Sequence, residues 1–81
     1  TKNVTVVTSA VSANTDFDTG VSGIDTAAAS RVEVYVNGQL LARGANAGAN
    51  LDFYPGTSDG ELKFEFDLEV DDVVTAILRA S

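Results

Sequence analysis

The feature that most constrains the fold is the segment of residues 31–41, which reads R-V-E-V-Y-V-N-G-Q-L-L. Val32, Val34 and Val36 alternate with charged or polar residues, which is the period of two expected of a half-buried strand. The Asn37-Gly38 dipeptide that follows tolerates the positive φ angles of a two-residue type I′ turn. The segment therefore predicts a β-hairpin whose three valines face a core.

A two-residue turn also determines which residues lie opposite each other in the hairpin. The expected cross-strand pairs are Val36 with Gln39, Tyr35 with Leu40, and Val34 with Leu41. The Tyr35–Leu40 pair falls on the face opposite the core. Two interpretations stay open for this pair. It is either a surface pair, alone or covered by a neighbouring loop, or a contact with another subunit, because tyrosine is enriched at interfaces.

Residues 61–70 give the longest alternation in the chain, E-L-K-F-E-F-D-L-E-V. The residues expected to face the core are Leu62, Phe64, Phe66, Leu68 and Val70. A helix would scatter these side chains around its circumference, so the pattern predicts one ten-residue strand. Fully burying each large apolar side chain is worth about 1.5–3 kcal/mol, so this strand is expected to be the largest single contributor to the core.

Residues 3–11 and 73–78 predict two further strands that are apolar on both faces. In the first, Val4 and Val6 lie on one face, and Val7 and Val11 lie on the other. Such strands are either central in a sandwich or covered by another chain. A short strand at 51–54, ended by Pro55-Gly56, completes the set.

The connecting segments contain turn-forming and small residues. Residues 12–23 predict a polar loop anchored in the core by Phe17, with Val21 and Ile24 as further anchors. Residues 43–50, built of Gly, Ala and Asn around one Arg, predict a second connecting loop. Five to six strands without a convincing helix predict an all-β fold, a small antiparallel β-sandwich or barrel that forms a single domain over residues 1–81.

Composition argues against several classes of function. The chain lacks His and Cys, so the commonest general base, thiolate metal ligands and disulfides are missing. Twelve acidic and five basic residues give a net charge of −7, which repels nucleic-acid phosphates and anionic lipid. No apolar run reaches the length of a transmembrane helix, and the first residues have no apolar stretch of signal-peptide length.

The acidic residues do not predict a catalytic or metal site. Alternate side chains of a strand are about 6.5–7 Å apart, whereas Ca²⁺ ligands converge to about 2.3–2.6 Å from one ion. The run Asp67, Glu69, Asp71 and Asp72 is therefore expected to be a solvated acidic face. Asp16 and Asp18 flank Phe17, but a glycosidase-like pair needs a deep cleft and stacking aromatics. We expect no enzyme, no cofactor and no bound metal.

Three segments together resemble a module common in tailed-bacteriophage proteins. They are the V-x-V-N-G-x-L hairpin of residues 34–40, the following L-D-F-Y strand at 51–54, and the closing segment L-E-V-D-D-V-V at 68–74. The family's closing pattern is L-x-x-G-D-x-V, so Asp71 stands here where the family usually has Gly. The resemblance covers roughly residues 31–78 and is shared by head-decoration, tail, baseplate and fibre proteins.

The resemblance implies a virion structural protein, either a head-decoration (cement) subunit or a tail or fibre module. It implies contacts with other virion proteins and a symmetric homo-oligomer, for which we expect a trimer. The residues expected at subunit contacts are Tyr35, Leu40, Val4, Val6, Val74 and Leu78. The alternative is a carbohydrate-binding or host-receptor-binding module, in which an exposed Tyr54 would stack on a sugar beside Asn50 and Asp52.

Overall fold

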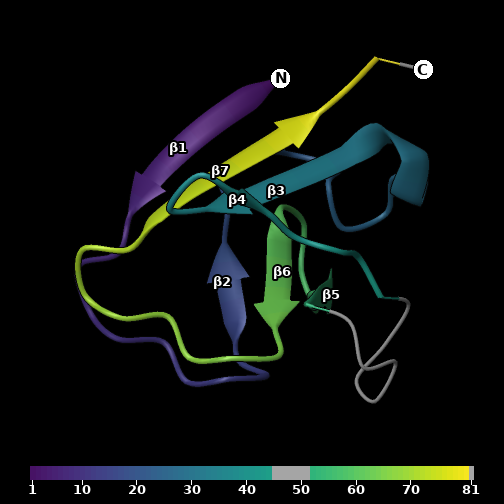
Figure 1. The fold of residues 1–81 in the computed structure, drawn as a ribbon. Coiled ribbons are helices and arrows are strands. Elements are labelled where there is room, and N and C mark those ends of the chain that lie inside the picture. Colours follow the sequence, from purple (N-terminus) through teal and green to yellow (C-terminus); the bar gives the residue numbers. More distant parts are fainter. Residues whose placement is uncertain (45–51, 81) are drawn as a thin grey trace.

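The computed structural model describes residues 1–44 and 52–80, which form two antiparallel β-sheets packed against each other (Figure 1). The four-stranded sheet consists, in spatial order, of β1 (Lys2–Val6), β7 (Val73–Leu78), β3 (Val32–Val36) and β4 (Gln39–Leu40). The three-stranded sheet consists of β2 (Asp16–Asp18), β6 (Glu61–Phe64) and β5 (Phe53–Pro55). A short 3₁₀ helix, η1 (Ala29–Arg31), precedes β3. The predicted all-β sandwich is confirmed, although the described residues contain seven strands and not the five to six expected.

The predicted hairpin forms as its sequence requires. Asn37 and Gly38 have φ angles of 53° and 84°, so both adopt the left-handed conformation of a type I′ turn. Tyr35 lies opposite Leu40, and Val36 lies opposite Gln39. The expected register of the hairpin is therefore confirmed. Residues 73–78 also form the predicted strand, and β7 lies in the middle of its sheet between β1 and β3.

Two predicted strands are shorter in the structure than in the prediction. The strand at 3–11 ends at Val6, and Val11 only forms an isolated bridge with Leu68. The strand at 61–70 ends at Phe64: residues 65–66 form a bend, and Leu68 then exchanges two backbone hydrogen bonds with Val11. Val70 is 53% exposed, so its predicted core position is wrong.

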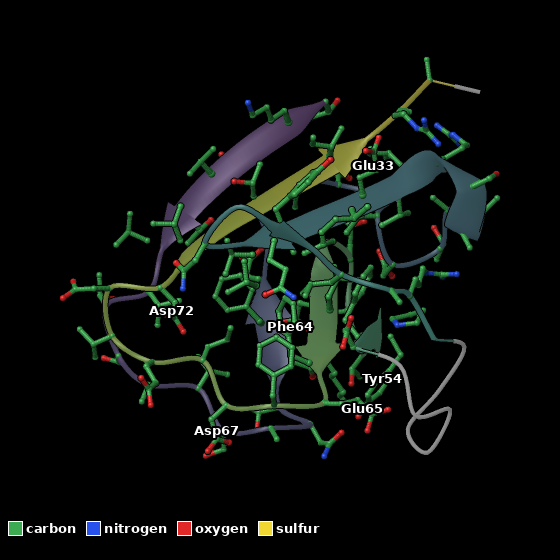
Figure 2. All side chains as sticks on the ribbon, in the orientation of Figure 1. Glu33, Tyr54, Phe64, Glu65, Asp67 and Asp72 are labelled. Atoms are coloured by element: carbon green, nitrogen blue, oxygen red, sulfur yellow. The ribbon has the colours of Figure 1, made fainter. Side chains whose placement is uncertain are left out.

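The core lies between the sheets and is centred on Phe64 (Figure 2). The Phe64 ring contacts Phe17 edge-to-face with centroids 5.8 Å apart, and it lies 6.2 Å from Phe53 and 5.6 Å from Phe66. Phe17, Val21 and Ile24 are buried as predicted, although Phe17 lies in β2 rather than in a loop. These aromatic contacts join both edges of the three-stranded sheet.

The turn before β7 contains a strained residue at Asp71. Its φ angle is 77°, in the left-handed region that costs a side chain with Cβ about 1–2 kcal/mol. The backbone amide of Asp71 donates to the Val7 carbonyl at 2.8 Å, which connects this turn to the end of β1. The pattern that residues 68–74 resemble has Gly at this position.

We expect Asp71→Gly to raise the free energy of unfolding by about 0.5–1 kcal/mol. Removing Cβ relieves the left-handed strain, and the greater backbone freedom of Gly in the unfolded chain offsets part of the gain. Urea unfolding measures the change. Asp71→Ala is the matched control because it removes the charge and keeps Cβ. An equal gain in both variants would show that charge, not backbone strain, is responsible.

Candidate functional site

The outer face of the four-stranded sheet is largely apolar. Six side chains form what we call the outer-face patch: Val4, Val6, Tyr35, Leu40, Val73 and Ile77. Val4, Val6 and Leu40 are 51%, 52% and 57% exposed. The other three are partly buried by their neighbours. Exposed apolar side chains that gather on one surface mark interaction sites, whereas single ones are ordinary.

Strand register places these side chains next to one another. Val4 pairs with Thr75 across β1 and β7, Thr75 pairs with Tyr35 across β7 and β3, and Tyr35 pairs with Leu40 in the hairpin. One row therefore crosses all four strands. The pair formed by Val6 and Val73 lies on one side of this row, and Ile77 lies on the other. The patch is contiguous because it follows the hydrogen-bonded ladder.

The outer face of the three-stranded sheet has the opposite character. Asp16 pairs with Lys63, and Asp18 pairs with Glu61, while the alternate residues Phe17 and Leu62 face the core. This sheet follows the usual alternation of apolar residues inside and charged residues outside. Its polar surface makes the apolar face of the other sheet a specific feature of the molecule rather than a general property of a small domain.

Polar contacts at the rim of the patch orient Tyr35. Its hydroxyl donates to the Glu33 carboxylate at 3.1 Å, and the same carboxylate pairs with Arg79 at 3.3 Å. The hydrogen bond to Glu33 raises the pKa of the Tyr35 phenol above its ordinary value. The tyrosine therefore stays neutral, with its hydroxyl held at the edge of the patch.

Four of the six predicted interface residues belong to the patch. Val4, Val6, Tyr35 and Leu40 all point outward, although they come from three strands. The prediction that Val74 lies at a subunit contact is wrong, because its side chain is 1% exposed and faces the core. Leu78 also packs against the core, where it is partly buried. Both faces of β7 are apolar, so the sequence did not distinguish the inward side from the outward one.

The residues proposed for glycan binding do not come together as a stacking site. Tyr54 is only 7% exposed, and its hydroxyl donates to Asn14 at 2.8 Å, so its ring has no free face for a sugar. The prediction of an exposed Tyr54 is wrong, because its ring is buried by neighbouring residues and its hydroxyl is bonded to Asn14. Asp52 accepts a hydrogen bond from the Ala42 amide at 2.9 Å. Asn50 lies outside the described residues.

A shallow pocket of about 350 Å³ opens beside the hairpin. It is lined by Val36, Asn37, Gln39, Leu41, Asp52 and Phe66. The side-chain amide of Asn37 already bonds the neighbouring turn. Its oxygen accepts from the Val73 backbone amide at 2.9 Å, and its nitrogen donates to the Asp72 carboxylate at 3.0 Å. The Asp52 carboxylate likewise already accepts a hydrogen bond from the Ala42 backbone amide. Asn37 therefore fixes the hairpin against β7, a role that the sequence analysis missed.

The acidic residues mostly cap turns. Asp72 accepts from the Glu69 amide at 2.8 Å and from the Asn37 side chain, and Asp16 accepts from the Thr57 amide at 2.9 Å. These hydrogen bonds lower the pKa of both carboxyls, with the backbone amide as the main cause in each case. Across residues 1–44 and 52–80, no group of three potential ligands is placed to hold a metal ion.

We expect the stability of the protein to fall in acid, partly through Asp72. Its pKa is lower in the folded state than its ordinary value of 3.8, so the unfolded chain takes up the proton first. The carboxylate therefore stabilises the fold above this pH, and the contribution is lost as pH falls through the folded pKa. In urea unfolding, Asp72→Asn is expected to be less stable than the natural chain at pH 7, and the difference is expected to shrink as pH falls below 3.8. A difference that stays constant with pH would contradict this account.

Within the described residues, the helical structure is one 3₁₀ turn, and no helix is long and apolar enough to cross a membrane. Comparisons of the chain with protein-family models, with curated proteins and with solved structures find no match. The geometry itself therefore identifies the candidate site. It is a contiguous apolar surface on a sandwich whose other outer face is charged.

Proposed function

We propose that this chain is a structural protein of a tailed-bacteriophage particle and that it assembles through the outer-face patch. The partners are other copies of the chain or neighbouring virion proteins. The role is that of a head-decoration subunit or a tail or fibre module, as the resemblance of residues 31–78 implies. The observation that carries the proposal is the patch itself, six apolar side chains on the face where a lone domain normally carries polar ones.

A partner that covers the patch gains free energy by removing apolar surface from water. Val4, Val6 and Leu40 are each about half exposed, so a partner could remove much of their apolar area from water. Burial of apolar surface contributes about 25 cal/mol per Å² before the costs of association. Tyr35 adds a ring held in place by Glu33, and orienting a side chain before binding reduces the entropy that an interface must remove.

The test uses particles of the phage whose genome encodes the chain. Mass spectrometry of purified particles is expected to detect the chain at a copy number in a fixed ratio to a major structural protein. Its absence from particles would overturn the virion assignment. Leu40→Lys is expected to lower incorporation at least tenfold, since burying an unpaired ammonium costs more than the 1.4 kcal/mol that equals a factor of ten.

The matched control is Ser58→Lys, which adds the same charge at an exposed position between β5 and β6. Ser58 lies in a turn of the other sheet, away from the outer-face patch, so the incorporation of Ser58→Lys is expected to be unchanged. Both substitutions are at exposed positions and are expected to change stability by no more than about 0.5 kcal/mol. Equal incorporation of both variants would show that the patch is not the assembly surface.

A further inference from the structure

The four-stranded sheet ends in an open edge at β1 (Figure 1). Thr1 and Leu78 exchange backbone hydrogen bonds, and Val7 donates to Asp72 at 2.9 Å. Hydrogen-bonded pairs alternate along an antiparallel ladder. Odd-numbered residues of β1 therefore bond β7, and Lys2, Val4 and Val6 direct their N–H and C=O groups away from it. An edge of this kind is a template for another strand.

The other edges are shorter or carry features that hinder pairing. The second edge of the same sheet, β4, has only two residues. In the three-stranded sheet, β5 ends in Pro55, which has no N–H to donate, and β2 has three residues with an Asp at each end. Among the described strands, β1 thus offers the longest edge of β-branched residues. Its only charged residue is Lys2, at its beginning.

Charge at the two ends of β1 selects the direction of pairing. Lys2 is exposed where the strand begins. Where it ends, the Asp71-Asp72 turn is hydrogen-bonded to Val7, and Asp72 lies beside the tip of the strand in Figure 2. A parallel copy would bring the two lysines together. An antiparallel copy instead brings Lys2 of each chain toward Asp71 and Asp72 of the other, so the edge is complementary to itself.

We propose that β1 pairs antiparallel with β1 of a second copy, about a two-fold axis at Val4. The facing pairs are then Lys2 with Val6, Val4 with Val4, and Val6 with Lys2. Each pair exchanges two N–H···O bonds, which uses the open groups of all three residues. The result is one continuous eight-stranded sheet, because two four-stranded sheets join, and the two outer-face patches lie on the same side.

This pairing goes beyond the proposed function and does not depend on it, since it concerns the edge of the sheet and not its face. It also differs from the trimer that the resemblance implies. A three-fold arrangement requires two different surfaces on each copy, whereas a two-fold contact uses one surface twice. The expected mass in solution is therefore twice the 8.4 kDa of the chain.

Cysteine cross-linking tests the register. The natural chain has no Cys, so Val4→Cys introduces a single thiol. Facing residues of a hydrogen-bonded pair have Cα atoms about 5.5 Å apart, within the disulfide range of about 4.4–6.8 Å. Mild oxidation is expected to give a covalent dimer. Val6→Cys is the matched control, because the two copies of residue 6 would be four positions, about 14 Å, apart. Equal cross-linking of both variants, or none in either, would overturn the register.

Amide hydrogen exchange by NMR tests the contact in the natural chain, in about 0.15 M salt to screen the net negative charge. In dilute solution, the amides of Lys2, Val4 and Val6 are expected to exchange fast and those of Asn3 and Thr5 slowly. At high concentration, the amides of Lys2, Val4 and Val6 are expected to become protected as well. Fast exchange at all concentrations would overturn the proposal.

Val4→Pro tests the pairing of the two β1 strands by removing the Val4 backbone N–H groups, which are the hydrogen-bond donors at its centre. The Val4 amide does not bond β7, and an edge strand accepts proline there. We expect the dissociation constant from sedimentation equilibrium to rise at least tenfold. Val4→Thr, which keeps the N–H and the β-branched shape, is expected to stay within about threefold of the natural chain. A dimer unaffected by Val4→Pro, or a trimer, would contradict β1 pairing.

Discussion

Phe64→Ala is expected to lower the free energy of unfolding by about 3–5 kcal/mol, the typical cost of removing a buried phenylalanine. The ring is 2% exposed and contacts Phe17, Phe53 and Phe66, so its loss leaves a cavity at the centre of the sandwich. Domains of this length have a total stability of about 4–12 kcal/mol. A large share of the folded state is therefore expected to be lost, as measured by urea unfolding.

Phe66→Ala is the matched control for Phe64→Ala. Phe66 is only partly buried and contacts the cluster from its rim, at 5.6 Å from the Phe64 ring. Phe66→Ala is expected to lower the free energy of unfolding by clearly less than Phe64→Ala does, because water can fill the space that the ring leaves. Equal losses in the two variants would show that the core is not centred on Phe64.

Thr19→Val is expected to lower the free energy of unfolding by about 1–3 kcal/mol. The Thr19 hydroxyl is buried, donates to the Gly60 carbonyl at 2.6 Å and accepts from the Val21 amide at 3.2 Å. Valine has nearly the same shape but cannot make either bond, so the buried Val21 amide loses its acceptor. The loop after β2 and the turn before β6 then lose one of their side-chain links, while the Asp59 carboxylate still bonds Ser22 and Gly23.

Thr19→Ser separates the hydrogen bonds from the packing. Serine keeps the hydroxyl and loses one methyl group, which costs about 0.8 kcal/mol for a buried carbon. Urea unfolding is expected to rank the natural chain first, then Thr19→Ser, then Thr19→Val. If Thr19→Val is as stable as the natural chain, the two hydrogen bonds contribute nothing to joining these loops.

Local sequence signals predict the hairpin but not every strand end. Asn37-Gly38 specifies both the turn and its register, because the geometry of a two-residue loop leaves little choice. The alternation of residues 61–70 predicts a strand but overstates its length. It ends at Phe64, and after a bend Leu68 exchanges two backbone hydrogen bonds with Val11, a contact between segments that are distant in sequence. Periodicity contains no signal for such a contact.

The candidate site could be predicted only in part for a similar reason. The hairpin register placed Tyr35 beside Leu40 on the face away from the core, and the structure confirms this. In β7, Val74 and Ile77 are equally apolar, so only the packing of the second sheet decides that Val74 faces inward. Thr19 gave no signal because a threonine in a polar loop looks like a surface residue until its partners are known.

The fold explains how an acidic domain could be suited to assembly. Acidic residues cap turns and cover the three-stranded sheet, while the apolar surplus gathers on the outer face of the other sheet. The open edge of β1 adjoins that face, so the proposed pairing of two copies would double the patch without covering it. Edge and face would then act in different contacts.

The most direct test of the central proposal is hydroxyl-radical footprinting of Tyr35 and Leu40, in the isolated chain and in intact particles. Pro55, on the three-stranded sheet, is the internal reference. The account predicts that Tyr35 and Leu40 lose most of their reactivity in the particle while Pro55 changes little. Unchanged reactivity of Tyr35 and Leu40 in particles that contain the chain would contradict assembly through the outer-face patch.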